Sequence, residues 1–191
     1  MSKDFLVIDF EFTQYTKHIG KPRAFFSEII EIGVVKIAAD TLEITGHIQN
    51  FVKPHFFPKQ AKESMAFCSI TETDMKSAID FKTMLQKLTS LYTPGTTYFV
   101  SWGNDDYKVV KEGCERHELP NPILPQDCLD LAAAYKLLKG ETRTIGLLKA
   151  AEELEINTDG HTHAAYDDAV NASRILLKLM EDGWKPDESL N

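Results

Sequence analysis

Apolar and polar residues follow two periods along the chain, one typical of strands and one typical of helices. The stretches 5–12, 29–37 and 42–52 are rich in β-branched and aromatic residues and predict three strands. In 5–12, FLVIDFEF, both faces are largely apolar, as in a central strand that is covered on two sides. The short AAD segment at 38–40 predicts a hairpin between the second and third strands.

Helical periodicity dominates the rest of the chain. Segment 81–92 has apolar residues at 81, 84, 85, 88, 91 and 92, which indicates an amphipathic helix, and a β-type run follows at 98–102. Further helices are predicted over 105–117, 144–154 and 167–183, and a brief strand turning into a helix over 128–138. Three strands followed by helices alternating with two short strands predict one α/β domain with a mixed sheet. We expect this domain to cover 1–182 and a C-terminal tail to cover 183–191.

Composition narrows the class of protein. The 191 residues are 43% apolar, which fits a single globular domain and argues against disorder. No apolar run reaches the ~18 residues of a membrane span, and the N-terminal MSKDFLVIDF lacks the features of a signal peptide. The three cysteines, Cys68, Cys114 and Cys128, form no CxxC or CxxH pair, so we expect reduced thiols in a cytoplasmic protein without structural zinc.

The net charge of −8 argues against a protein that coats nucleic acid by releasing counterions. It is compatible with an enzyme that binds phosphate groups through divalent cations, because such a site requires acidic side chains. The position of the acids therefore matters more than their number.

Two acids lie within the most apolar predicted strand. Residues i and i+2 of a strand point the same way, roughly 6.5–7 Å apart, so Asp9 and Glu11 share one face. Two buried carboxylates repel each other and need compensation, which a pair of divalent cations can supply. The alternative is that the strand ends at Ile8 and both acids are solvated.

Two helices each begin with a pair of aspartates, of which one faces inward. In the last helix Asp168 shares the face of the apolar stripe, while Asp167 falls on the solvent face, where an N-terminal cap is the simpler interpretation. In the helix over 105–117, Asp106 aligns with apolar positions and Asp105 with charged ones. The stripe of the last helix runs through Ala172, Ile175, Leu176, Leu179 and Met180.

The order of these motifs resembles a known family. DFE at 9–11, SWGNDD at 101–106 and HAAYDD at 163–168 are similar to the motifs of the DEDDh 3′-5′ exonucleases, in particular the Eri-type branch, over about residues 5–180. The resemblance implies a ribonuclease-H-like fold, a five-stranded mixed sheet flanked by helices. It also implies hydrolysis of terminal phosphodiesters at the 3′ end of single-stranded nucleic acid, RNA more than DNA, with release of nucleoside monophosphates.

The resemblance also implies the site residues. Asp9, Glu11, Asp106 and Asp168 would bind two Mg²⁺ or Mn²⁺ ions, and His163 would be the general base that activates the attacking water. A histidine suits this task because its ordinary pKa of about 6.5 lets it accept a proton near neutrality. His161 falls outside the motif.

Several aromatic and polar residues are candidates for contact with the substrate. Phe12 and Thr13 follow the metal-binding Glu11, and Trp102 closes a strand, although Phe12 and Trp102 could equally be packing residues. The segments KPRAFF (21–26) and KPHFFPK (53–59) interleave bases with aromatics, as a rim for a single strand or as solvated loops.

Two other functions remain open from the sequence. A His-x-His metal site at His161 and His163 would suit a hydrolase of small phosphoesters, but it leaves three of the inward acids without a role. A non-catalytic binding module of the same fold would use the metal ions and phosphate contacts only for recognition. The presence of all four acids and the histidine argues against this lost activity.

Overall fold

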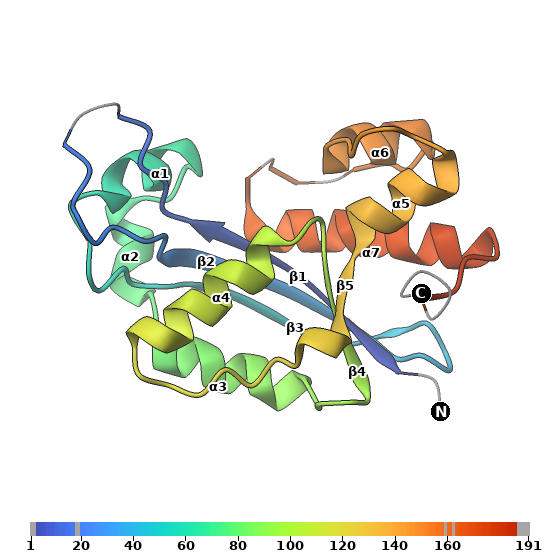
Figure 1. The fold of residues 1–191 in the computed structure, drawn as a ribbon, viewed down its shortest axis with the longest axis horizontal. Coiled ribbons are helices and arrows are strands. Elements are labelled where there is room, and N and C mark those ends of the chain that lie inside the picture. The colour runs from blue at the N-terminus through green and yellow to red at the C-terminus, as the bar shows by residue number, and fades with distance from the viewer. Residues whose placement is uncertain (1–2, 18–19, 159, 162, 187–191) are drawn as a thin grey trace.

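A five-stranded mixed sheet forms the centre of the fold (Figure 1), as the sequence predicts. The computed structural model describes residues 3–17, 20–158, 160–161 and 163–186. The strand order is β3-β2-β1-β4-β5, with β1 antiparallel to β2 and parallel to β4. The strands are β1 (Asp4–Phe12), β2 (Ile29–Ile37), β3 (Ile44–Phe51), β4 (Thr97–Ser101) and β5 (Cys128–Asp130).

Helices cover both faces of the sheet (Figure 1). Helices α3 and α4 pack on one face, and α5, α6 and α7 pack on the other. Two short helices, α1 and α2, lie in the segment between β3 and α3, for which the sequence pattern predicted no element. The helices are α1 (Ala61–Phe67), α2 (Glu72–Ser77), α3 (Phe81–Leu91), α4 (Asp105–Arg116), α5 (Leu131–Lys139), α6 (Leu147–Glu153) and α7 (Ala165–Glu181).

The central strand β1 divides its side chains between two hydrophobic cores. Leu6, Ile8 and Phe10 belong to the core beneath α3 and α4. Phe5 and Val7 belong to the core beneath α5, α6 and α7. Because side chains alternate along a strand, the next odd-numbered residues of β1 continue the row that faces α7. The strand continues to Phe12, so the alternative in which it ends at Ile8 is excluded.

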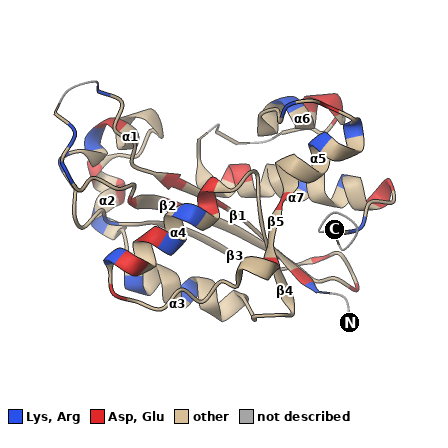
Figure 2. Cartoon of the chain, viewed as in Figure 1, with Lys and Arg blue, Asp and Glu red and all other residues tan. Residues whose placement is uncertain are grey.

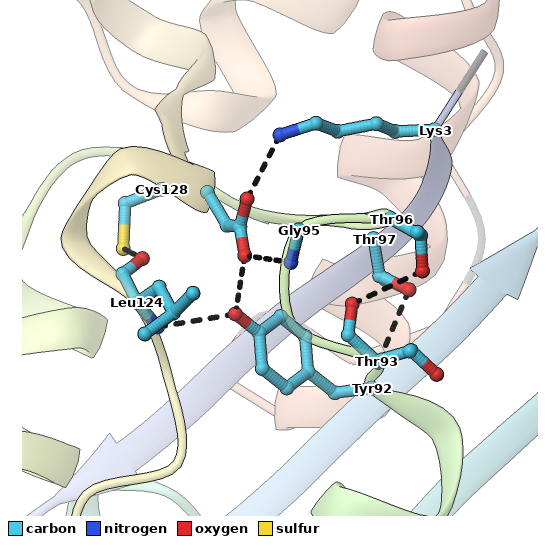
Figure 3. A network of polar contacts seen from close by, with 9 residues as sticks. Lys3, Tyr92, Thr93, Gly95, Thr96, Thr97, Leu124 and Cys128 are labelled. Atoms are coloured by element: carbon cyan, nitrogen blue, oxygen red, sulfur yellow. Dashed lines mark hydrogen bonds and ion pairs between the residues drawn. The ribbon is translucent and has the colours of Figure 1, made fainter. Parts of the chain in front are cut away.

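A network of polar contacts that includes Lys3, Tyr92 and Gly95 (Figure 3) lies at the end of the sheet where β1 begins. Asp127 has no exposed surface and accepts hydrogen bonds from Lys3 Nζ at 2.8 Å, the Tyr92 hydroxyl at 2.6 Å and the Gly95 amide at 2.8 Å. The Tyr92 hydroxyl in turn accepts from the Leu124 amide. Burial tends to raise the pKa of Asp127, but these donors outweigh it and hold the pKa below its usual value. This ion-paired network therefore has a structural role.

The packed core continues past the predicted domain boundary at residue 182. Trp184 is 7% exposed and belongs to the core beneath α5, α6 and α7. The remainder of the predicted tail, 187–191, lies outside the described residues. Among the described helices, none is both long and apolar enough to cross a membrane.

Candidate active site

A glycine on β2 allows the start of α7 to lie directly on the sheet. In the antiparallel pairing of β1 and β2, Asp9 is opposite Gly33 and Glu11 is opposite Glu31. A Cβ atom on Gly33 would lie only 2.1 Å from the carbonyl carbon of Ala165, the first residue of α7. Only a residue without a side chain fits this approach. The approach brings the first turn of α7 over the acids of β1.

The Asp106 carboxylate also lies beside β1, at the edge that faces β4. Strand β4 pairs with β1 only as far as Val7, which leaves later β1 amides without a β4 partner. One of them, the Phe10 amide, donates to the Asp106 carboxylate at 2.9 Å. Asp106 is 6% exposed, whereas the side chain of Asp105 is 76% exposed and pairs with Lys108 at 2.9 Å. The helical periodicity therefore predicted the directions of both aspartates.

Acidic side chains from three elements converge at this point. Figure 2 shows the acidic positions of β1 and of the starts of α4 and α7 close together. Burial raises the pKa of Asp9 well above its usual value, and nearby carboxylates raise it further. Burial also raises the pKa of Asp106 to about 7 and is the largest cause of the raised pKa of Glu11 and of Asp168. The carboxylates that act on Asp9 are, in decreasing order, Asp106, Glu11, Asp168 and Glu31.

His163 lies at the exposed edge of this acidic cluster. Its backbone has a φ of +64°, a left-handed conformation that is uncommon outside glycine, and its amide donates to Asp168 Oδ2 at 3.2 Å. Glu11, His163 and Asp168 each offer a ligand atom, and these atoms lie within 4.8 Å of one another. The structure thus brings together the five residues that the motifs single out.

A pocket of about 570 Å³ opens beside His163. Phe12 contributes to its wall and also packs against the core beneath α3 and α4. Helix α1 forms the opposite wall, where the exposed ring of Phe67 lies with its centroid 4.5 Å from that of His163. The Cys68 thiol, just after α1, donates to Glu11 Oε2 at 3.0 Å. The pocket therefore has aromatic side chains next to the acidic cluster.

Sequence reasoning missed three residues near the site. Glu31 is 2% exposed, accepts from the Ala165 amide at 3.4 Å, and has its pKa raised to about 7, chiefly by burial. A signal for it existed, since it is the one acid in a predominantly apolar strand. Phe67 and Cys68 carried no comparable signal, because their positions depend on α1, which no periodicity predicted.

The other two candidates for substrate contact lie outside the pocket wall. Thr13 is fully buried, and its hydroxyl oxygen accepts from the Glu28 amide at 2.9 Å. The indole N–H of Trp102 donates to the Ile145 carbonyl at 3.0 Å, and its ring packs 6.0 Å from that of Tyr135. These contacts correspond to the packing interpretation that the sequence left open for Trp102.

The two aromatic segments, 21–26 and 53–59, pack on each other. The rings of Phe25 and Phe57 are 5.2 Å apart, and those of Phe26 and Phe56 are 5.1 Å apart. The Glu28 carboxylate accepts from the amides of residues 55–57 and fixes the second segment. These phenylalanines therefore form one aromatic cluster, in which Phe26 is buried and Phe56 is exposed.

The donor set fits hard divalent cations. Carboxylate oxygens predominate, and Mg²⁺ and Mn²⁺ prefer oxygen ligands. Among the described residues, one group of at least three potential ligands is close enough to hold an ion, and it contains His163 but lacks His161. The His-x-His alternative therefore finds no support in the geometry.

Comparison with known proteins decides the family. A family model described as Exonuclease (RNase_T) matches residues 6–176, most of the chain. The chain belongs to this exonuclease family. It is 37% identical over 176 residues to the probable 3′-5′ exonuclease KapD of Bacillus subtilis (strain 168), covering 92% of the chain and 83% of that protein.

Two further similarities define the class more closely. The human protein named 3′-5′ exoribonuclease 1 is 28% identical over 188 residues, and the chain spans about half of its length, 52%. The crystal structure of the nuclease domain of 3′hExo, a DEDDh family member bound to rAMP, superimposes with a TM-score of 0.81 at 27% identity, covering 95% of the chain and 94% of that domain. The chain is thus a 3′-5′ exonuclease of the DEDDh class with a ribonuclease-H-like fold.

The raised pKa values predict how the stability of the metal-free protein depends on pH. A carboxyl whose pKa is higher in the folded state contributes stability that is complete below its unfolded-state pKa, about 4, and is lost as pH rises through its folded-state pKa. For Asp106 and Glu31 that folded-state pKa is about 7. We therefore expect the melting temperature in EDTA to fall between pH 5 and pH 8, and Mn²⁺ to restore it. Thermal melting of the wild type and Asp106→Asn checks this, because the variant should show a shallower fall.

Proposed function

We propose that this protein removes nucleotides one at a time from the free 3′ end of single-stranded nucleic acid, RNA in preference to DNA, and releases nucleoside monophosphates. One observation carries the proposal: four carboxylates from three elements converge beside His163, and Glu11 and His163 of this group line a pocket with aromatic side chains in its wall. Asp9, Glu11, Asp106 and Asp168 would hold two Mg²⁺ or Mn²⁺ ions. The preference for RNA draws on relatives named exoribonucleases.

The chain's own residues would divide the reaction between them. When bound, the divalent cations would offset the charge of the phosphodiester and activate a water molecule for in-line displacement. His163, exposed beside Glu11 and Asp168, would accept the proton of that water. Phe12 and Phe67 would contact the terminal nucleotide, since aromatic faces stack on any base.

The direct test compares oligonucleotides that differ only at their ends. We expect a 5′-labelled RNA with a free 3′ hydroxyl to shorten in single-nucleotide steps with Mg²⁺ or Mn²⁺, and a 3′-phosphorylated copy to resist. A 3′ phosphate adds bulk and negative charge to the terminal nucleotide, in place of the hydroxyl group that defines a free 3′ end. Equal degradation of both strands, or full activity in EDTA, would contradict the proposal.

A matched DNA strand tests the preference for RNA. We expect the RNA strand to be degraded faster, as the names of the exoribonuclease relatives suggest. Such a preference would require contacts to the 2′ hydroxyl, the group that DNA lacks. Faster loss of DNA would overturn the RNA assignment and leave the exonuclease assignment intact. Binding of labelled strands without shortening in Mn²⁺ would instead support a non-catalytic module.

A further inference from the structure

The backbone that precedes α7 folds back onto the side chain of Asp167. The carboxylate accepts a hydrogen bond from the amide of His161, six residues earlier in the chain, at 2.8 Å. Gly160 lies against the same carboxylate, since a Cβ atom on it would be 2.2 Å from Asp167 Cγ. With a φ of +90°, Gly160 adopts a conformation that favours glycine. The side chain of Asp167 is therefore in contact with backbone atoms, and the residue is half-buried.

Other backbone contacts complete the anchorage of this segment. The Ala164 amide donates to the His161 carbonyl at 3.1 Å, which closes a turn around His163. The His163 amide donates to Asp168 and the Ala165 amide donates to Glu31. The carboxylates of Asp167, Asp168 and Glu31 thus accept hydrogen bonds from the amides of residues 161, 163 and 165. These hydrogen bonds fix the backbone at His163 and on both sides of it.

The helix does not use Asp167 as its cap. Ala164 is the N-cap residue of α7 and its side chain makes no capping hydrogen bond. The geometry therefore differs from the sequence-based interpretation, in which Asp167 is a solvent-facing residue that stabilises the end of the helix. Asp105, which precedes Asp106 as Asp167 precedes Asp168, does fit that description, since it is exposed and contacts Lys108 within its own helix.

We propose that Asp167 is a positioning residue for catalysis: it anchors the segment 160–161 and thereby places the His163 imidazole against Glu11 and Asp168. The proposal deepens, and rests on, the proposed exonuclease function. His163 needs such an anchor because its left-handed backbone is not a conformation that the chain adopts readily by itself. Asp167 itself touches neither substrate nor cation in this proposal.

Replacement of Asp167 by alanine is the main test. Asp167→Ala removes the acceptor and should lower kcat about ten- to a hundredfold, the loss that accompanies a displacement of a catalytic group by about 1 Å. KM and Mn²⁺ affinity should change little. Asp167→Asn keeps an oxygen that can accept from the His161 amide, so it should retain most of the activity. Asp105→Ala is the matched control and should match the wild type.

A double-mutant cycle distinguishes positioning from general damage to the fold. If Asp167 acts through His163, Asp167→Ala should cause no further loss of rate in a His163→Ala background. An equal loss in both backgrounds, or a parallel loss of Mn²⁺ affinity, would overturn the proposal. Unchanged kcat in Asp167→Ala would also overturn it.

Hydrogen exchange tests the anchor without using activity. The His161 amide, bonded to Asp167, should exchange at least about tenfold faster in Asp167→Ala than in the wild type, and at an unchanged rate in Asp105→Ala. Unchanged exchange in Asp167→Ala would overturn the anchor. If the wild type degrades no nucleic acid but His161 exchange responds as expected, the exonuclease proposal fails and the anchor stands.

Discussion

Asp106→Asn is expected to abolish exonuclease activity, with a loss of about a thousandfold or more, or about 4 kcal/mol of transition-state stabilisation. The buried carboxylate of Asp106 stands at the point where β1 loses its partner β4, and it faces the acids of β1. An asparagine can still accept from the Phe10 amide, so the local structure should persist. It lacks the negative charge that a divalent cation requires. Mn²⁺ titration and the exonuclease rate measure the effect.

The same substitution should stabilise the metal-free protein. Burial raises the pKa of Asp106 to about 7, so the ionised side chain is unfavourable above that pH when no cation is bound. We expect a melting temperature a few degrees higher in EDTA at pH 8, since 1 kcal/mol corresponds to about 2–4 °C in a domain of this size. Asp105→Asn, which disturbs an exposed ion pair, should change little. If Asp105→Asn loses Mn²⁺ as completely as Asp106→Asn, the assignment of faces is wrong.

Periodicity predicted the sheet because the burial of its strands has a simple sequence signature. The strand β2 begins and ends as predicted, and β1 runs one residue further at its start. Helices α1 and α2 have seven and six residues, too short to show an apolar stripe, and they are fixed by contacts with the rest of the chain. Helix α1 nevertheless forms a wall of the active-site pocket, through Glu63, Ser64 and Phe67. The shape of the pocket was therefore beyond prediction.

The same distinction holds for the active site. Features that depend on spacing within one element could be predicted, and features that depend on contacts between elements could not. Spacing within one element was sufficient to predict that Asp9 and Glu11 share a face, and that Asp106 points inward. It could not show that the segment before α7 turns back onto Asp167, because a helical projection gives direction only relative to the helix axis. Glu31 needed the register of β2 against β1 before its place opposite Glu11 was evident.

His163→Ala is expected to lower kcat by about 10²–10⁴-fold, the usual contribution of a general base, while Mn²⁺ binding survives. His163 is exposed at the edge of the carboxylate cluster, so an alanine there leaves the four proposed acidic ligands in place. Its amide can still donate to Asp168, because that hydrogen bond involves the backbone alone. The measurement is the single-turnover rate on a 3′-hydroxyl oligonucleotide at saturating Mn²⁺, with Mn²⁺ affinity determined separately.

The neighbouring histidine supplies the control. His161→Ala should be nearly silent, because His161 contacts Asp167 through its backbone amide and its exposed side chain lies outside the potential ligand group. The alanine retains that amide, so the anchor of the segment should persist. Equal loss of activity from His161→Ala and His163→Ala, together with weaker metal binding in both, would instead establish a shared His-x-His metal site. A loss confined to His163→Ala, with metal affinity intact, would identify the imidazole of His163 as the proton acceptor, because removal of a ligand would weaken metal binding as well.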